Sequence, residues 1–231
     1  MKIVFVGPSL PNAHQLAGTG IKVRPPAIQG DLRRAVDEGA TAIGLIDGAF
    51  EYVAPVWHKE ILFGLANGVT IYGAASMGAL RAAECQAFGM IGVGEIFRGY
   101  ASGGLVDDAD VALLHGPEEV NYVAVTLPLV NVTATLARCR RKDVICAQEE
   151  RWIAESANAL FFKARTWVAI VERCGEIEPL RLAELLTILK TQYVDQKRLD
   201  ALSLIEALRQ TSQPSAVPSF DFNRTSLWRE H

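Results

Sequence analysis

One serine stands where a nucleophile is expected. Ser76 follows the apolar run T-I-Y-G-A-A, and the segment after it, M-G-A-L-R-A-A-E, has helical character. Small residues on both sides permit a sharp strand-to-helix turn, as in the G-x-S-x-G motif, although Ala74 replaces its first glycine. The first N–H groups of the helix, at Met77 and Gly78, lack helical partners and suit an oxyanion. The alternative role of Ser76 is an ordinary N-cap.

A base for Ser76 is expected at the start of the preceding helix. His58 and Lys59 stand in its first turn, and this helix follows the strand 41–48. We therefore expect both side chains at the same sheet edge as Ser76. Histidine has a suitable unperturbed pKa, and a desolvated lysine serves as the base in Ser-Lys enzymes. The ordinary alternatives are a surface histidine and a solvated lysine.

Further polar residues are predicted at this edge, where the strands end. The loop after the first strand suits an anion, but no Walker lysine follows it. The candidate binding residues are Gly7, Pro8, Ser9, Asp47, Arg24 and Arg81, and Lys22 lies near this edge after the first strand. Arg81 and Glu84 are one helical turn apart, which predicts an ion pair.

Metal, cofactor and nucleic-acid binding are not expected. The four cysteines are scattered without a C-x-x-C pair, so they predict neither a zinc site nor a disulfide framework, and the cytoplasm is the expected location. Asp107, Asp108 and Asp110 are interpreted as solvated loop acids. The formal net charge of −3 disfavours nucleic acid. No apolar run reaches the roughly 20 residues that span a bilayer, so no membrane is expected.

The elements that must position these residues alternate along the first hundred positions. Strands are predicted at 2–7, 41–48 and 69–76, and helices at 28–40, 55–68 and 77–88. This order is typical of an α/β fold with a Rossmann-like parallel sheet. Residues 89–117 are glycine-rich and predicted to be irregular.

The second half of the chain is predicted to be largely helical. Helical spacing of apolar residues extends from 118 to about 209, with a bend near Pro128, and a loose tail is expected after Thr211. We therefore predict an α/β core over 1–117 and a mostly helical region over 118–231, although both could pack as one unit.

Several sequence blocks together resemble one family. V-F-x-G-P-S-L, R-P-P-A-x-x-G-D, I-G-L-I-D-G-x-F, V-W-H-K-E-I-L and Y-G-A-A-S-M-G-A-L-R-A-A-E look like the core of TfuA proteins. The segments G-x-G-x-I-F-x-x-Y and D-D-A-D-V-A-x-x-H extend the similarity, which covers about residues 1–120 in order.

The resemblance implies a partner of YcaO enzymes, which exchange the oxygen of a peptide backbone amide for sulfur. It implies hydrolysis of a thiocarboxylated, ThiS-like sulfur carrier protein, which supplies sulfide, and help for YcaO in engaging its peptide substrate. The implied Ser-Lys pair is Ser76 and Lys59, with Lys22 as runner-up. One alternative is a non-catalytic adaptor, and a weaker one is a nucleotide-binding module.

Overall fold

The N-terminal half forms a parallel β-sheet. The computed structural model describes residues 1–49, 51–175, 177–212, 220–225 and 228. Five strands lie in the order β2-β1-β3-β4-β5, and every neighbouring pair is parallel. They are β1 (Lys2–Phe5), β2 (Ile21–Arg24), β3 (Ala42–Leu45), β4 (Thr70–Ala74) and β5 (Ile91–Val93). The chain turns back beside β1, so the ends of β1 and β3 form the switch point where such sheets bind ligands.

Helices follow most strands and continue through the second half of the chain. They are α1 (Ala13–Leu16), α2 (Asp31–Asp37), α3 (His58–Ala66), α4 (Met77–Cys85), α5 (Gly94–Ala101), α6 (Leu129–Arg141), α7 (Ala147–Asn158), α8 (Trp167–Glu172), α9 (Pro179–Thr191) and α10 (Gln196–Gln210). Short 3-10 turns lie at Gln86–Phe88, Asp108–Asp110, Glu118–Val120 and Phe162–Ala164. In the described part of the chain, no helix has the length and hydropathy that crossing a bilayer requires.

The described chain divides into two compact units. Unit 1 comprises residues 1–105 and 198–231, and unit 2 comprises residues 106–197. The helix α10 therefore returns to the unit that holds the sheet. Unit 2 is helical, with a core between α6, α7, α8 and α9 that includes Leu136, Ile153, Ile170 and Leu185.

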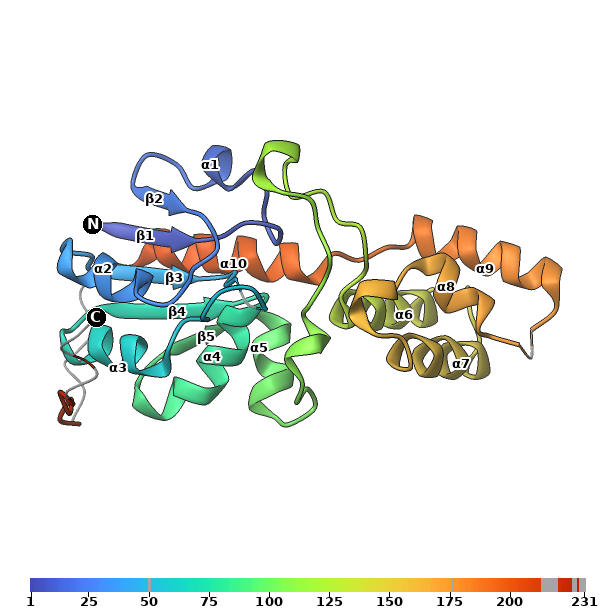
Figure 1. Cartoon of the computed structure of the whole chain (residues 1–231). Coiled ribbons are helices and arrows are strands. Elements are labelled where there is room, and N and C mark those ends of the chain that lie inside the picture. The colour runs from blue at the N-terminus through green and yellow to red at the C-terminus, as the bar shows by residue number, and fades with distance from the viewer. Residues whose placement is uncertain (50, 176, 213–219, 226–227, 229–231) are drawn as a thin grey trace. The chain divides into compact units, whose positions relative to one another are not determined.

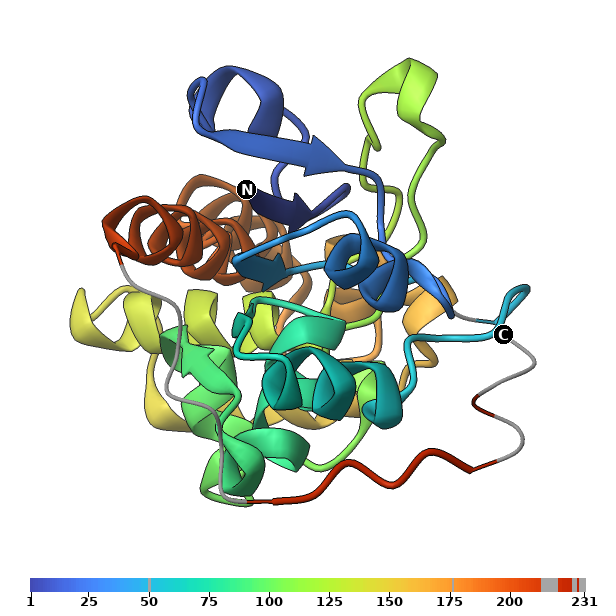
Figure 2. The ribbon, with the colours of Figure 1, turned by 90° about the vertical axis from the view of Figure 1, so that its left-hand side faces the viewer.

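Both faces of the sheet in unit 1 are covered. One face packs against α2, α3 and α4 through Ile3, Phe5, Ile43 and Ile71. The other face packs against α1 and α10, and Figures 1 and 2 show α10 opposite α3 and α4. Burial on both faces explains why the inner strands are almost wholly apolar. The predicted α/β class, with a parallel sheet and a largely helical second half, is confirmed.

Two of the five strands were not predicted. The edge strand β2 contains Lys22 and Arg24, and β5 has three residues, one of them Gly92, in a segment predicted to be irregular. The same segment contains α5. Both are edge strands and are only partly buried, so neither has the continuous apolar run that marks an inner strand.

The helix predicted from residue 118 begins only at Leu129. Pro117 and Pro128 bracket the segment, and Asn121 and Tyr122 have φ values of +53° and +50°, which no α-helix contains. His115 and Ala124 instead form an antiparallel bridge. In the tail predicted to be loose, residues 213–219, 226–227 and 229–231 lie outside the described residues.

Candidate functional site

Ser76 lies in a tight turn between β4 and α4. Its N–H donates to the Ala74 carbonyl at 2.7 Å, across Ala75, whose φ is +66°. This geometry is a γ-turn with positive φ at its centre, a rare and strained conformation for a residue with a Cβ. Ala75 is fully buried. The fold therefore holds a strained backbone directly before the candidate nucleophile.

Glycines allow this turn to approach the sheet. A Cβ at Gly73 would lie 2.1 Å from the Gly78 carbonyl oxygen, and one at Gly78 would lie 1.8 Å from the Leu45 carbonyl oxygen. The Gly78 N–H donates to the Ile46 carbonyl at 3.1 Å. The first turn of α4 is thus fixed against the backbone of β3 and β4, which explains the cluster of small residues around Ser76.

The Ser76 hydroxyl is free for chemistry. It does not cap α4, so the expected alternative role as a side-chain N-cap is not the one found. It has no hydrogen-bond partner among the described residues, where Thr70 Oγ1 is the one unpaired side-chain polar atom fully shielded from solvent. Although Ser76 is only 7 % exposed, its hydroxyl therefore reaches the surface.

One backbone donor stands beside this hydroxyl. The Met77 N–H donates to no group in the described part of the chain, whereas the Gly78 N–H is taken by Ile46. Of the two donors expected to stabilise an oxyanion, the structure therefore leaves Met77 available and occupies Gly78.

The Gly7-Pro8-Ser9 loop, which was expected to bind an anionic ligand, binds the carboxylate of Asp47 instead. The N–H groups of Gly7 and Ser9 donate to Asp47 Oδ2 at 2.8 and 3.0 Å, and Ser9 Oγ donates to Asp47 Oδ1 at 2.6 Å. Asp47 and Ser9 are buried. These donors are therefore occupied, and the expectation that they face a substrate is corrected: they join β1 to β3 at the switch point.

The Asp47 network adjoins the Ser76 turn. A Cβ at Gly48 would lie 2.9 Å from Met77 Cγ, so the residue after Asp47 packs directly on the residue after Ser76. The structure thus brings together Asp47 and Ser9 from one side and Ser76 and Met77 from the other.

His58 lies along α4 and away from Ser76. Its Nε2 is 2.8 Å from Glu84 Oε2, and Glu84 also accepts from Arg81 at 2.6 Å, which confirms the predicted Arg81–Glu84 ion pair. Glu84 is eight residues beyond Ser76, or about 12 Å along the helix axis. The structure therefore pairs His58 with Glu84, and no contact between described residues joins His58 to Ser76.

Lys59 is engaged by the C-terminal segment. Its Nζ donates to Thr225 Oγ1 at 2.8 Å and lies 5.7 Å from the centroid of the Phe222 ring. Phe222 and Trp228 in turn pack on Phe63 of α3, with ring centroids 5.4 and 5.0 Å away. No contact between described residues joins Lys59 to Ser76.

Lys22 and Arg24 form ion pairs outside this site. Both pair with Glu38, Lys22 at 3.7 Å, and the Arg24 guanidinium also lies 5.8 Å from the Phe5 ring centroid. The hydrogen bond from Arg24 holds the pKa of Glu38 below its usual range. No contact between described residues links either cation to Ser76.

One buried carboxylate at the sheet edge was missed. Asp200 of α10 accepts a hydrogen bond from the Ile96 N–H at 2.8 Å, at the start of α5. A Cβ at Gly94, whose φ is +94°, would lie 2.2 Å from Asp200 Cγ. Gly94 is a detectable sequence signal for a turn, but nothing local to Asp200 indicates a partner about a hundred positions earlier.

The fold and the site define an α/β protein of doubly wound topology, with an accessible serine hydroxyl at a strained strand-to-helix turn. The family model described as TfuA-like protein matches residues 47–166, just over half of the chain, so the chain belongs to the TfuA-like family. No match was found among curated proteins. Membership supports a role in the TfuA/YcaO thioamidation system and suggests association with a YcaO partner.

Proposed function

We propose that this protein acts in the cytoplasm as a hydrolase that releases sulfide from a thiocarboxylated, ThiS-like carrier. The sulfide supplies a YcaO enzyme that thioamidates a peptide backbone, and the protein also assists YcaO in engaging that peptide. The observation that carries the proposal is that the Ser76 hydroxyl and the adjacent Met77 N–H both lack a hydrogen-bond partner among the described residues.

The proposed reaction has two steps. Ser76 Oγ attacks the thiocarboxyl carbon while a base accepts its proton, and the Met77 N–H stabilises the oxyanion. The carbon–sulfur bond then breaks, hydrogen sulfide leaves, and an ester joins Ser76 to the carrier. Water cleaves the ester, which regenerates Ser76 and releases the carrier carboxylate.

Lys59 is the proposed base, with Lys22 and His58 as the alternatives. Since Lys59 Nζ is bound to Thr225, the proposal requires this contact to break before the lysine can accept the proton of Ser76. Asp47 and the Gly7-Pro8-Ser9 loop hold the edge in shape, and Arg24 and Arg81 remain candidates for binding the carrier.

A non-catalytic adaptor is the second candidate function. The observation that favours it is the engagement of Lys59 by Thr225, together with the burial of the Gly7 and Ser9 donors against Asp47. An adaptor would bridge YcaO, carrier and peptide without needing the Ser76 hydroxyl.

Sulfide release from a purified thiocarboxylated carrier separates the two functions. We expect Ser76→Ala to lower the rate at least a hundredfold, while Ser203→Ala, which removes an exposed hydroxyl on α10, leaves it unchanged. Equal rates in the wild type and Ser76→Ala, or no release by the wild type with YcaO present, would favour the adaptor.

The base is tested by variants matched in charge. Lys59→Ala should abolish most of the release, and Lys22→Ala, which removes a cation paired with Glu38, should not. Thr225→Val should raise the rate because it frees Lys59. A loss in His58→Ala alone would transfer the role of base to His58.

A further inference from the structure

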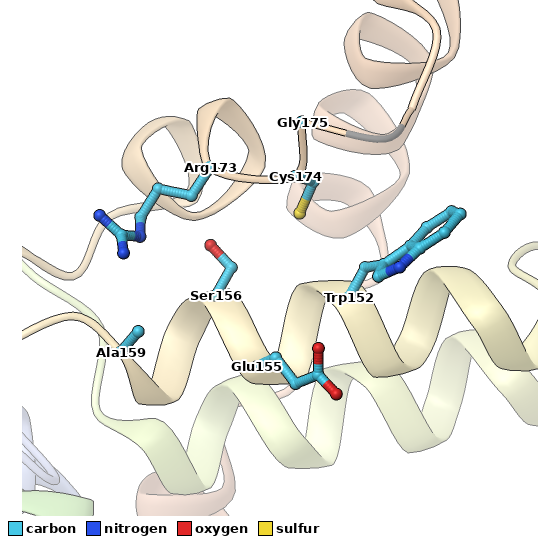
Figure 3. Close-up of a pocket in the computed structure, with 7 residues that line it drawn as sticks. All are labelled: Trp152, Glu155, Ser156, Ala159, Arg173, Cys174 and Gly175. Carbon is cyan, nitrogen blue, oxygen red and sulfur yellow. The ribbon is translucent and has the colours of Figure 1, made fainter.

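Unit 2 contains a pocket that the proposed hydrolysis does not use. It lies between α7 and the segment that follows α8, and its volume is about 420 Å³. Its lining residues, drawn in Figure 3, are Trp152, Glu155, Ser156, Ala159, Arg173, Cys174 and Gly175. This volume falls in the range typical of ligand sites.

The floor of the pocket is buried and neutral. Ser156 Oγ donates to the Ile170 carbonyl at 2.6 Å, and Cys174 Sγ donates to the same oxygen at 3.4 Å. Burial raises the pKa of the Cys174 thiol, which therefore stays protonated. Ala159 and Gly175 contribute almost no side-chain bulk, so the space above this floor is open to a ligand.

The charged groups of the pocket are opposite in sign and unpaired. Glu155 and Arg173 are exposed, and neither forms an ion pair or hydrogen bond through its side chain with another described residue. Some other charges in unit 2 are paired, as in the Arg181–Glu149 bridge at 2.7 Å.

The two charges belong to different ends of the pocket. Figure 3 shows the Arg173 guanidinium toward Ala159, and Trp152 at the opposite end of the α7 segment. Trp152 and Glu155 are three residues apart on α7 and so share one side of the helix. The pocket thus has a cationic end near Ala159, while Trp152 and Glu155 line the part nearer the start of α7.

We propose that this pocket binds a short extended peptide segment that carries a basic side chain at one end and a carboxylate at the other. An indole ring and a carboxylate each attract an arginine or lysine side chain, and a guanidinium attracts a carboxylate. From Trp152 to Ala159 the helix rises about 10 Å, the length of about three extended residues.

Binding is tested on the full chain with the capped tetrapeptide Arg-Gly-Gly-Asp and its reverse, Asp-Gly-Gly-Arg. The readout is the NMR shift of the Trp152 indole N–H, assigned with Trp152→Phe. We expect at least one of the two peptides to bind and to lose tenfold or more in affinity when Asn replaces Asp or Gln replaces Arg.

Two variants assign each charge to its partner. Arg173→Gln should weaken the Asp peptide tenfold and remove its advantage over the Asn peptide. Glu155→Gln should do the same for Arg over Gln. The matched control, Arg151→Gln, removes an exposed arginine on α7 outside the pocket and should leave affinity unchanged.

Three results would overturn the proposal: no shift at millimolar peptide, equal affinity for charged and neutral peptides, or equal weakening by Arg173→Gln and Arg151→Gln. Circular dichroism of each variant checks folding, which the exposed positions of Glu155 and Arg173 should preserve. Because sulfide release is measured separately, failure of peptide binding does not bear on the role of Ser76.

Discussion

At the scale of single residues, the shape of the carboxyl edge depends on Asp47. Its two carboxylate oxygens accept three hydrogen bonds from Gly7 and Ser9 in a fully enclosed position. Gly48, the next residue, packs on Met77 beside Ser76. The geometry around Ser76 should therefore depend on a carboxylate that has no role in the proposed reaction.

We expect Asp47→Ala to lower the free energy of unfolding by about 2–4 kcal/mol, because it leaves the N–H groups of Gly7 and Ser9 buried without acceptors. Asp47→Asn keeps one acceptor oxygen and should cost less. Denaturant unfolding measures both. If Asp47→Ala were as stable as the wild type, the network would not hold the edge.

Single residues also show which features a local sequence pattern can predict. Ser76 was located from the small residues around it, because a strand-to-helix turn is a local feature. Its available hydroxyl depends on Gly78 bonding to Ile46, which only the packed sheet reveals. Lys59 was predicted beside Ser76, yet its partner is Thr225, 166 positions away, and no local signal indicates such a contact.

At the scale of elements, α10 covers one face of the sheet together with α1. Ala201, Leu204, Ile205 and Leu208 are fully buried against it. The close approach depends on Gly44, where a Cβ would lie 2.6 Å from Leu204 Cδ2 and 3.2 Å from Val4 Cγ2. The helical spacing of α10 was predictable from sequence, but no local signal indicates that this helix packs on β3.

Gly44→Ala tests this contact. The added methyl group should cost about 1–3 kcal/mol of stability by overpacking, and Leu204→Ala alone should cost about 2–5 kcal/mol. Since the second change makes room for the first, the double variant should lose less than the sum. Strict additivity in denaturant unfolding would contradict the packing of α10 on β3.

In unit 2, Glu149 at the start of α7 bonds to Arg181 of α9. The hydrogen bonds from Arg181 hold the pKa of Glu149 below its usual range. A carboxyl with a lowered folded pKa stabilises the protein above its unfolded pKa, near 4.3, and this stability is lost as pH falls through the folded value.

We therefore expect the wild type to lose more unfolding free energy than Glu149→Gln between about pH 5 and pH 3. At neutral pH, Glu149→Gln should cost about 1 kcal/mol. Glu184→Gln removes a more exposed partner of Arg181 and serves as the control, with a smaller effect. Parallel pH profiles for the wild type and Glu149→Gln would contradict this assignment.

At the scale of the whole molecule, unit 1 is built from both ends of the chain. The chain leaves this unit after Leu105 and returns at Arg198, and the helices α6 to α9 lie in the insertion. The boundary near residue 117 was predicted from a change in the sequence pattern. That change marks where the alternation of strands and helices stops. The return of α10 to the sheet depends on contacts between segments that are distant in sequence. A change in the local sequence pattern does not indicate such contacts.

We predict that replacing residues 106–197 with a flexible Gly-Ser linker leaves a unit 1 that unfolds cooperatively. A chain that ends after residue 105 lacks α10, exposes one face of the sheet, and should not fold. Thermal unfolding followed by circular dichroism distinguishes them. Cooperative unfolding of residues 1–105 alone would show that α10 is dispensable.

The central claim is that Ser76 is the nucleophile, and the most direct test is the mass of the intermediate. After rapid mixing with the thiocarboxylated carrier and acid quenching, we predict an adduct equal to protein plus carrier less hydrogen sulfide. Proteolysis should map it to the peptide that contains Ser76, and Ser76→Ala should form none. Sulfide release without an adduct at Ser76, or an equal adduct in Ser76→Ala, would contradict the account.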